Sequence, residues 1–598
     1  MGYNFRPPGV LERLFQVKTA DTGEKTELKR CLTLFPLMVQ GLAHMLGAGI
    51  FVITPSIIQS VAGPATCISY LLSGLAAGLS VICYSDLASR YSCSGSAYVY
   101  TYFSLGECAA AIIGFFLIGE LIIQSPMLTL GLADNIDLFI FNGTVHAWEG
   151  EYFPAWFLNT ELIAIGTMVC FTVINLYGIK IVAYINIAIA GVSVLTLFTF
   201  CGVALAKGSV ENLYKVVNPE DGRTGFAPFG FSGILSGAGI AFFAFVGLEA
   251  VVTLGEEAVN PKRDLPRATI GSFLMVLVLY VLTAFSIAFF VPWYELSGNT
   301  GLIGSLRNRG FKAAEYILTV GLIFTVFACG LCNLTTVVRV VYSVAEDGLV
   351  FSFLSVVNKR TQVPMWNVLV CGILGIGTSI VYDFDTLSHM ISGGTLMVFM
   401  LTAVAVMILS YDTSDRELPV TKSEKTRLIP LPQGRFNIST SRKRHFIICQ
   451  TVFFLSAILL SCLLTYFTQT TLIICMECVL FLMILTSLSL IRLNIPLKEG
   501  EDSLSFKSPF KPFVQGFSIL INLLLLLHLK PVALQQLSIY AAVGLVVYLC
   551  YGIFFSKITN RKQNQFLIQL TAECEDTDKL VPDTADGLPK LLSFEKSL

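Results

Sequence analysis

Apolar segments long enough to cross a lipid bilayer recur along most of the sequence. A helix needs about 18 or more mostly apolar residues to span the hydrocarbon core, and we find about fourteen such segments. They fall at residues 33–58, 65–88, 96–125, 160–178, 181–206, 230–255, 268–291, 315–342, 363–382, 386–410, 445–467, 470–491, 512–529 and 534–556. The chain is 13% charged, whereas soluble domains are about 25% charged. The sequence therefore predicts an all-α polytopic membrane protein with about fourteen transmembrane helices.

Lysine and arginine residues predict the orientation of these segments, because cytoplasmic loops carry an excess of both. With a cytoplasmic N-terminus, 32 of the 39 basic residues fall inside and 7 fall outside. An even number of segments then places the C-terminus in the cytoplasm as well, and we expect the protein in the plasma membrane. The sequon at Asn142 lies in the external loop 126–159, which has no lysine or arginine, so we predict glycosylation there.

Several classes of function are excluded by the composition and by the polar segments. A net charge of -1 offers no basic surface for nucleic acid. The 16 cysteines are scattered and mostly lie inside apolar segments, where cysteine usually acts as a small buried hydrophobe, so we expect no metal site. The soluble segments are too short to form a domain and contain no nucleophile with a neighbouring base. We therefore expect neither enzymatic activity nor a cofactor.

Glycines interrupt two of the apolar segments near their midpoints. The first segment contains MLGAGIFV, with Gly47 and Gly49, and the sixth contains AFFAFVGLEAVV, with Gly247 ahead of the acid Glu249. Glycine costs about 1 kcal/mol relative to alanine inside a helix, and a broken helix persists in lipid only where it lines a cavity. Breaks at corresponding positions of two halves indicate a central binding site. The alternative is that these glycines only allow close helix packing.

Four motifs carry a resemblance to a known family. They are SGSAYVYTYFSLGE at 94–107, GFAPFGFSGILSGA at 225–238, FFAFVGLEAVVTLGEEAVNP at 242–261 and VRVVYSVAEDGL at 338–349. With these motifs, in this order, the chain resembles the cationic amino acid transporters of the amino acid–polyamine–organocation superfamily. Met45 replaces a small hydroxyl residue of the family, as in its type-4-like branch.

The resemblance implies the leucine-transporter fold, in which ten core helices form a five-plus-five inverted repeat. The implied organisation is a cytoplasmic segment at 1–32, the ten-helix core at 33–410, a basic cytoplasmic loop at 411–444, four accessory helices at 445–556 and a cytoplasmic tail at 557–598.

The resemblance also implies where an amino acid would bind. Its α-carboxylate would meet the backbone amides of the first break, at Leu46, Gly47, Ala48, Gly49 and Ile50. Exposed amides at a helix terminus favour an anion. Its ammonium group would meet carbonyl oxygens of the second break, around Phe243, Ala244 and Val246.

Acidic residues inside the segments are further candidates, because charged groups in the bilayer are costly and usually functional. Glu107 and Glu120 in the third segment are expected either to balance a cationic substrate or to make structural hydrogen bonds. Glu249, next to the second break, is expected to act in gating. The remaining gating candidates at the inner ends of spans six and eight are Glu256, Glu257, Arg339, Glu346 and Asp347.

The resemblance implies sodium-independent uptake of arginine, lysine and ornithine by a uniporter that the membrane potential drives. The alternatives are a carrier of neutral amino acids and a nutrient sensor that binds an amino acid but transports little. The expected partners are the amino acid substrate and the lipid bilayer. Relatives that pair with a single-span glycoprotein use a cysteine in the external loop after the third span, and 126–159 has none. We therefore expect no disulfide-linked heavy chain.

Overall fold

A computed structural model gives the fold of most of the chain. It describes residues 14, 16–18, 28–47, 49–137, 162–214, 223–296, 306, 310–359, 361–381, 384–411, 438–466, 471–497, 506–528 and 531–557. Ala48, Asn142, most of the predicted basic loop and the tail from residue 558 lie outside the described residues. What was predicted for them therefore stays a prediction.

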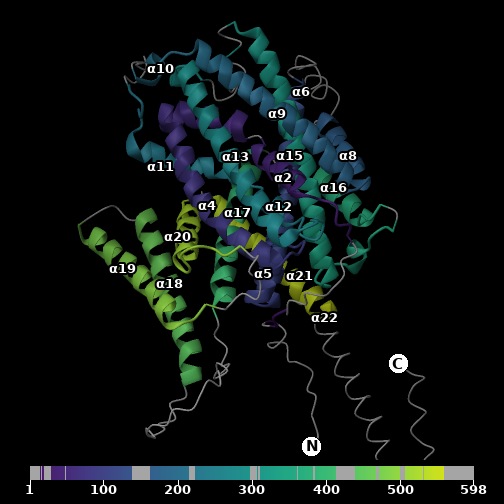
Figure 1. Cartoon of the computed structure of the whole chain (residues 1–598), viewed down its shortest axis with the longest axis vertical. Coiled ribbons are helices and arrows are strands. Elements are labelled where there is room, and N and C mark those ends of the chain that lie inside the picture. Colours follow the sequence, from purple (N-terminus) through teal and green to yellow (C-terminus); the bar gives the residue numbers. More distant parts are fainter. Residues whose placement is uncertain are drawn as a thin grey trace, which may run out of the picture.

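Helices make up nearly all of the described structure (Figure 1). In the first part of the chain they are α2 (Leu34–Leu46), α3 (Thr54–Ile57), α4 (Thr66–Arg90), α5 (Ala97–Ser104), α6 (Glu107–Ile136), α8 (Leu162–Leu176), α9 (Ile179–Lys207), α10 (Glu211–Tyr214), α11 (Gly230–Ala241), α12 (Glu249–Val252) and α13 (Pro261–Phe290). They continue with α15 (Lys312–Glu346), α16 (Met365–Val381), α17 (Phe384–Ser410), α18 (Ile438–Tyr466), α19 (Thr471–Asn494), α20 (Phe513–Leu527), α21 (Pro531–Val547) and α22 (Ile553–Phe555). The described residues form no strand, only two isolated bridges. The predicted all-α class is confirmed.

The helices account for the predicted membrane spans. In the described part of the chain, nine helical stretches are long and apolar enough to cross a membrane, and five shorter apolar helices accompany them. Each of the fourteen predicted segments overlaps at least one of the helices. Two of the shorter helices, α2 and α11, are the first halves of spans one and six, which the glycines interrupt.

Three predicted segments differ from the structure by more than four residues in where a helix begins, and one of them is 268–291, whose helix α13 begins at Pro261. The segment predicted at 96–125 is divided, because α5 ends at Ser104 and Gly106 has a φ of 101° before α6 begins. Only glycine adopts that conformation without strain. The segment predicted from residue 445 begins earlier, at Ile438, because the basic residues ahead of the apolar run continue the helix. Their long side chains suit a helix end that leaves the hydrocarbon core.

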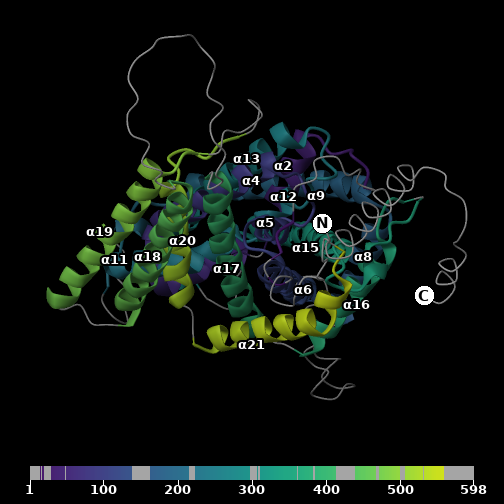
Figure 2. The same ribbon diagram turned by 90° about the horizontal axis from the view of Figure 1, so that it is seen from below.

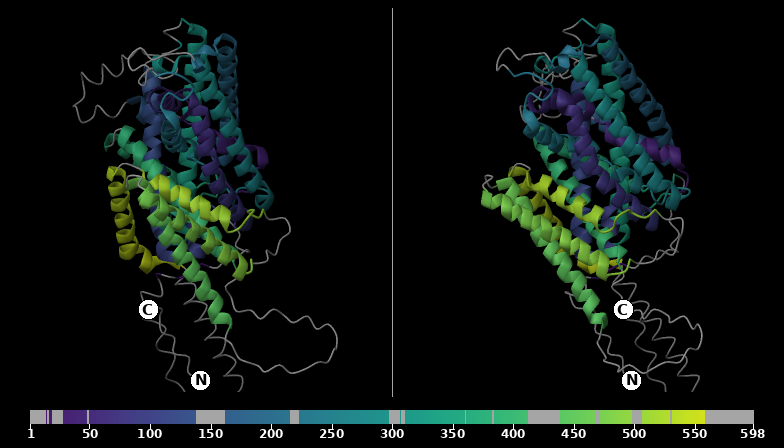
Figure 3. Two further views of the ribbon diagram at one scale, coloured as in Figure 1. Left: turned by 90° about the vertical axis from the view of Figure 1, so that its left-hand side faces the viewer. Right: turned by 60° about the vertical axis from the view of Figure 1, so that its left-hand side comes forward.

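The interior of the bundle is formed by the helices that flank the two breaks. α4 packs against α13, and α15 packs against α6, α9 and α2. The apolar part of α15 is 72% buried, whereas that of α19 is 22% buried. α18 and α19 form a hairpin at the edge of the molecule (Figures 1 and 2), and α20 connects it to α17 and α4. In Figure 3, α18 extends beyond the core at the lower end of the molecule.

Candidate functional site

The first span is broken where its glycines predicted. α2 ends at Leu46, and after Gly47 the chain continues as a π-helical turn (η1, Gly49–Ile53). Carbonyl oxygens that lose their helical hydrogen bonds at the break lie close to a donor on another helix. The Tyr280 hydroxyl of α13 lies 3.2 Å from the Met45 carbonyl oxygen and 3.3 Å from that of Leu46, within donating distance of both. The break is therefore a supported feature of the fold rather than a frayed helix end.

The sixth span is broken at the second predicted position. α11 runs into a 3-10 turn (η5, Phe242–Phe245), and α12 begins only at Glu249. Between them Gly247 has a φ of 100°, which favours glycine over every other residue. The predicted ammonium-binding residues in or beside this break are Phe243, Ala244 and Val246.

The two breaks face each other inside the bundle. A Cβ atom placed on Gly49 would lie 3.5 Å from the Cα and Cβ atoms of Ala244. One placed on Gly247 would lie 2.8 Å from the ring of His44 at the end of α2. The structure thus brings together the predicted residues of spans one and six, and their binding of a substrate stays a prediction. The described members of the first break are Leu46, Gly47, Gly49 and Ile50.

Two buried carboxylates lie beside this junction, Glu120 of α6 and Glu249 of α12. They are close enough for their charges to interact. The Thr395 hydroxyl donates a hydrogen bond to one oxygen of Glu120. The other Glu120 oxygen has no hydrogen-bond partner among the described residues, and neither Glu249 oxygen has a side-chain donor there, although the backbone amides of Gly247 and Glu249 lie near the Glu249 carboxylate. Burying polar oxygens without partners is unfavourable, so this acid pair is suited to a ligand that donates hydrogen bonds. Glu249, predicted to act in gating, lies here.

Glu107 occupies a different place from Glu120, although both belong to α6. Its carboxylate accepts hydrogen bonds from Tyr102 (2.8 Å), Ser556 (2.8 Å) and Tyr548 (3.2 Å). At 1.5 Å per residue, about 20 Å of helix separates it from Glu120. The structure therefore does not bring Glu107 to the two breaks. Its three bonds favour the structural alternative, and a role in substrate binding stays a prediction.

Predicted gating residues of spans six and eight form a buried ion pair. The Arg339 guanidinium of α15 donates two hydrogen bonds to Glu257, at 3.0 and 2.7 Å. The two side chains are 3% and 1% exposed. The Glu257 carbonyl oxygen also accepts bonds from the backbone amides of Cys31 and Leu32, just ahead of α2. These contacts tie the inner ends of spans one, six and eight together.

A second set of contacts closes the same end of the molecule. Asp347, next to α15, accepts hydrogen bonds from the Lys18 ammonium (2.6 Å) and the Tyr98 hydroxyl (2.9 Å). Burial lowers the pKa of Lys18, but the charge of Asp347, its hydrogen bond and the charges of other nearby acidic groups together raise the pKa above its ordinary value. A side-chain oxygen of Glu256 accepts a bond from the Ser94 amide, while Glu346 is exposed at the end of α15. We use the name inner gate for the contacts of Lys18, Asp347, Glu257 and Arg339; that they act as a gate, and that they face the cytoplasm, stay predictions.

Some residues of the site carry no sequence signal. Tyr280 and Cys329 lie within apolar helices, where the sequence indicates only packing residues. In the structure the Cys329 thiol donates a hydrogen bond to the His44 carbonyl oxygen at 3.0 Å. Lys18 lies in a polar segment without a motif. The Thr54 hydroxyl donates a hydrogen bond to the Gly49 carbonyl oxygen. Its place in the sequence, one or two turns after a glycine break, is the one pattern that would have predicted this residue as part of the site.

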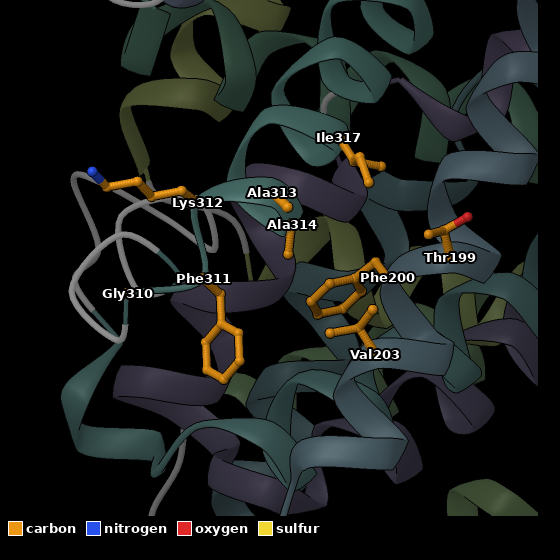
Figure 4. Close-up of a pocket in the computed structure, with 9 residues that line it drawn as sticks. All are labelled: Thr199, Phe200, Val203, Gly310, Phe311, Lys312, Ala313, Ala314 and Ile317. Carbon is orange, nitrogen blue, oxygen red and sulfur yellow. The ribbon is translucent and has the colours of Figure 1, made fainter.

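A separate pocket lies at the opposite end of α15 from the inner gate. It has a volume of about 390 Å³ and is lined by Thr199, Phe200, Val203, Gly310, Phe311, Lys312, Ala313, Ala314 and Ile317 (Figure 4). The Lys312 side chain points away from Thr199 and Phe200. The length of α15 places this pocket roughly 50 Å from Asp347. It contains none of the predicted site residues.

Comparison with known proteins places the chain in a family. The family model described as amino acid permease matches residues 32–432, and that described as C-terminus of AA_permease matches residues 506–556. Cationic amino acid transporter 4 of Mus musculus is 28% identical over 581 residues, covering 91% of this chain and 90% of that protein. The vacuolar cationic amino acid transporter 4 of Arabidopsis thaliana is 29% identical over 580 residues, covering 89% and 93%. The mitochondrial cationic amino acid transporter 3 of Arabidopsis thaliana is 28% identical over 572 residues, covering 89% and 92%.

A helical membrane protein with two facing helix breaks, closed at one end by ion pairs, has the construction of a membrane transporter. The chain belongs to the amino acid permease family, and its function is amino acid transport. The members of this family are transporters and not enzymes. The predicted resemblance to the cationic amino acid transporters is thereby confirmed at the level of the family.

Proposed function

We propose that this protein takes up cationic L-amino acids such as arginine, lysine and ornithine, without sodium and driven by the membrane potential. The observation that carries the proposal is the buried acid pair, Glu120 and Glu249, beside the two helix breaks. The names of the relatives, cationic amino acid transporters, agree with a cationic substrate.

The acid pair supports a cationic substrate because it lacks a basic partner. In the described part of the chain, neither carboxylate forms an ion pair, and three of their four oxygens have no side-chain hydrogen-bond donor. Two acids in a site of low polarity repel each other unless a cation or a proton joins them. A guanidinium or ammonium group would supply both the charge and the donors, and the planar guanidinium can bond two oxygens at once.

The remaining parts of an amino acid would be bound by the backbone at the breaks. Amides at the first break would hold the carboxylate, and carbonyl oxygens at the second would hold the ammonium group. Because both groups are common to all amino acids, this part of the site does not select among them. We therefore assign selectivity for cationic side chains to Glu120 and Glu249.

The experiment is uptake of labelled arginine and labelled alanine by Glu120→Gln and Glu249→Gln variants. We expect each variant to lose at least about tenfold in arginine uptake, which corresponds to a loss of about 1.4 kcal/mol in binding free energy. Each variant should retain more of its alanine uptake. Glu107→Gln is the matched control, because it neutralises an acid of the same helix away from the breaks, and should reduce both substrates alike. Equal losses at Glu120 would contradict the proposal, and arginine binding without flux would favour a sensor.

We further propose that the protein lies in the plasma membrane with both termini in the cytoplasm. The imbalance of basic residues supports this orientation. The first and last described segments meet, since Gln16 and Ser556 both bond to Glu107, which agrees with termini on one side. Protease protection of tags added to either end tests the orientation.

A further inference from the structure

The end of the last helix binds a carboxylate of the transporter core. α21 packs along α6 and α17 and continues through a π-helical turn (η8, Tyr548–Gly552) into α22. From this segment the Tyr548 hydroxyl donates to one oxygen of Glu107 at 3.2 Å, and the Ser556 hydroxyl donates to the other at 2.8 Å. Both donors are fully or almost fully buried. Hydrogen bonds to a charged acceptor are among the stronger ones in proteins.

The same segment also contacts the loop that carries Asp347 of the inner gate. The backbone amide of Lys557 donates to the Asp347 carbonyl oxygen at 3.1 Å. Gly348 has a φ of 82°, and a Cβ atom placed on it would lie 2.3 Å from the Phe555 carbonyl oxygen. The two backbones therefore touch, and only glycine allows that approach. Nearby, the rings of Phe351 and Tyr551 lie 5.1 Å apart.

The N-terminal segment meets these two carboxylates from the other direction. The Gln16 carbonyl oxygen accepts a hydrogen bond from the Glu107 amide at 3.0 Å. The Lys18 ammonium bonds to the Asp347 carboxylate at 2.6 Å. Glu107 and Asp347 thus connect the start of α6 and the end of α15 to both ends of the described chain. Figure 2, seen from below, shows α21 running along the edge of the bundle, where it packs against α6 and α17.

We infer that residues 548–557 form a latch that holds the inner gate closed and must detach before the transporter opens to the cytoplasm. The inference rests on amino acid transport and not on the cationic specificity proposed above. Opening this end requires α6 and α15 to separate from the N-terminal segment, because the bonds of Lys18 and Gln16 span that junction. The latch is bonded to both helices at the same point. It therefore stabilises the closed arrangement, and its release favours the open one.

Cys93 provides a native reporter of this gate. It lies in the link between α4 and α5, where its thiol senses the charges of Glu256, Lys18 and Asp347. Burial, and then the charge of Glu256, raises the pKa of Cys93 to about 12. Because the thiolate is the reactive form, the closed gate should react slowly with maleimides. Entry of water on opening would bring the pKa back toward its ordinary value and speed the reaction.

The test measures how fast a membrane-impermeant maleimide modifies Cys93 from the cytoplasmic face of inside-out vesicles, by mass spectrometry of the Cys93 peptide. The latch variant is Tyr548→Phe with Ser556→Ala, which removes both donors to Glu107 but keeps the apolar packing. The matched control is Tyr551→Phe, which removes a hydroxyl from the same segment that makes no hydrogen bond to Glu107. Arg339→Lys, which breaks the two-bond pair with Glu257 and leaves the charges around Cys93 in place, is the positive control.

We expect the latch variant to raise the modification rate at least about tenfold, since two bonds to a charged group are lost, while Tyr551→Phe leaves it unchanged. An unchanged rate in a folded latch variant would overturn the inference, and a lowered melting temperature alone would show that the segment is only an anchor. If the double variant does not fold, Ser556→Ala alone must raise the rate. Because the readout needs no substrate, a failure of the cationic proposal leaves it unaffected.

Discussion

Gly49 is a position at which a single added methyl group should impair transport. A Cβ atom there would lie 2.6 Å from the Tyr280 hydroxyl oxygen. Tyr280 is fully buried, stacks on Tyr70 and bonds the carbonyl oxygens of the first break, so it cannot move aside freely. We expect Gly49→Ala to reduce amino acid uptake at least about tenfold, a loss that corresponds to about 1.4 kcal/mol. Uptake normalised to surface expression measures the effect.

The control for this prediction removes the obstructing atom. Tyr280→Phe deletes the hydroxyl that Gly49→Ala would meet, so the double variant should recover part of the lost uptake if the clash is the cause. Gly47→Ala separates steric contact from backbone strain, because its Cβ atom would lie 3.1 Å from the sulfur of Cys329, whereas its backbone, with a φ of 19° and a ψ of -149°, disfavours alanine. Normal transport by Gly49→Ala would mean that the glycine only packs and that the proposed backbone site is misplaced.

Individual residues were predictable from the sequence where they break a local rule. Gly47, Gly49 and Gly247 weaken helices, and Glu120 and Glu249 place acids inside membrane spans, so each is conspicuous among apolar neighbours. Residues that follow the rules were not predictable. Tyr280 is one tyrosine in an apolar helix, and nothing local shows that its hydroxyl reaches the first break, because that contact depends on how α13 packs against α2.

At the scale of secondary structure elements, Arg339 of α15 should be essential because it neutralises a buried carboxylate of the loop after α12. Removing one partner of a buried pair leaves an uncompensated charge, which typically costs about 3–5 kcal/mol. We expect Arg339→Ala to lower the melting temperature of the detergent-solubilised protein strongly. Lys18→Ala should lower it much less, because the Lys18 side chain is 26% exposed and partly exposed pairs contribute about 1 kcal/mol or less.

Replacing both partners of the Arg339–Glu257 pair distinguishes the effect of an unpaired buried charge from the effect of lost packing. Apolar residues in place of a buried ion pair are often neutral or stabilising, so Arg339→Leu combined with Glu257→Leu should restore much of the melting temperature lost in Arg339→Ala. Transport should not recover with it, because the gate would have lost the polar pair that can separate into water. Equal melting temperatures for the single and the double variant would contradict this explanation.

The number and order of elements followed from hydrophobicity, but some of their ends did not. Fourteen apolar segments were recognisable because bilayer thickness fixes the length of a span. The division of the third segment at Gly106 was not, since neighbouring residues fit a helix and the turn shows only as a positive φ. In the sixth segment Gly247 marked the break correctly, yet the sequence did not show that α12 ends after Val252.

At the scale of the whole molecule, the closed inner gate and the two facing breaks together suit a carrier that exposes its site to one side at a time. The inner gate joins spans one, six and eight at one end, and the breaks lie within two of these spans, one and six. The accessory helices differ in how they contact this core. α18 and α19 lie at its edge, whereas the end of the last helix is bonded to Glu107 and Asp347.

The energy source for transport is a property of the whole transport cycle. The proposed uniport predicts that this source is the membrane potential, and uptake measurements can test that. A carrier that moves one positive charge without a coupled ion is driven by about 2.3 kcal/mol per 100 mV, which sustains close to fiftyfold accumulation of arginine. In vesicles with an inside-negative potential of about 100 mV, potassium with valinomycin should collapse that accumulation, whereas replacing sodium with choline should change it little. A carrier of neutral amino acids would ignore the potential, and a sodium symporter would fail in choline. Accumulation that survives depolarisation would therefore contradict potential-driven uniport, even if the buried acid pair proves to select arginine.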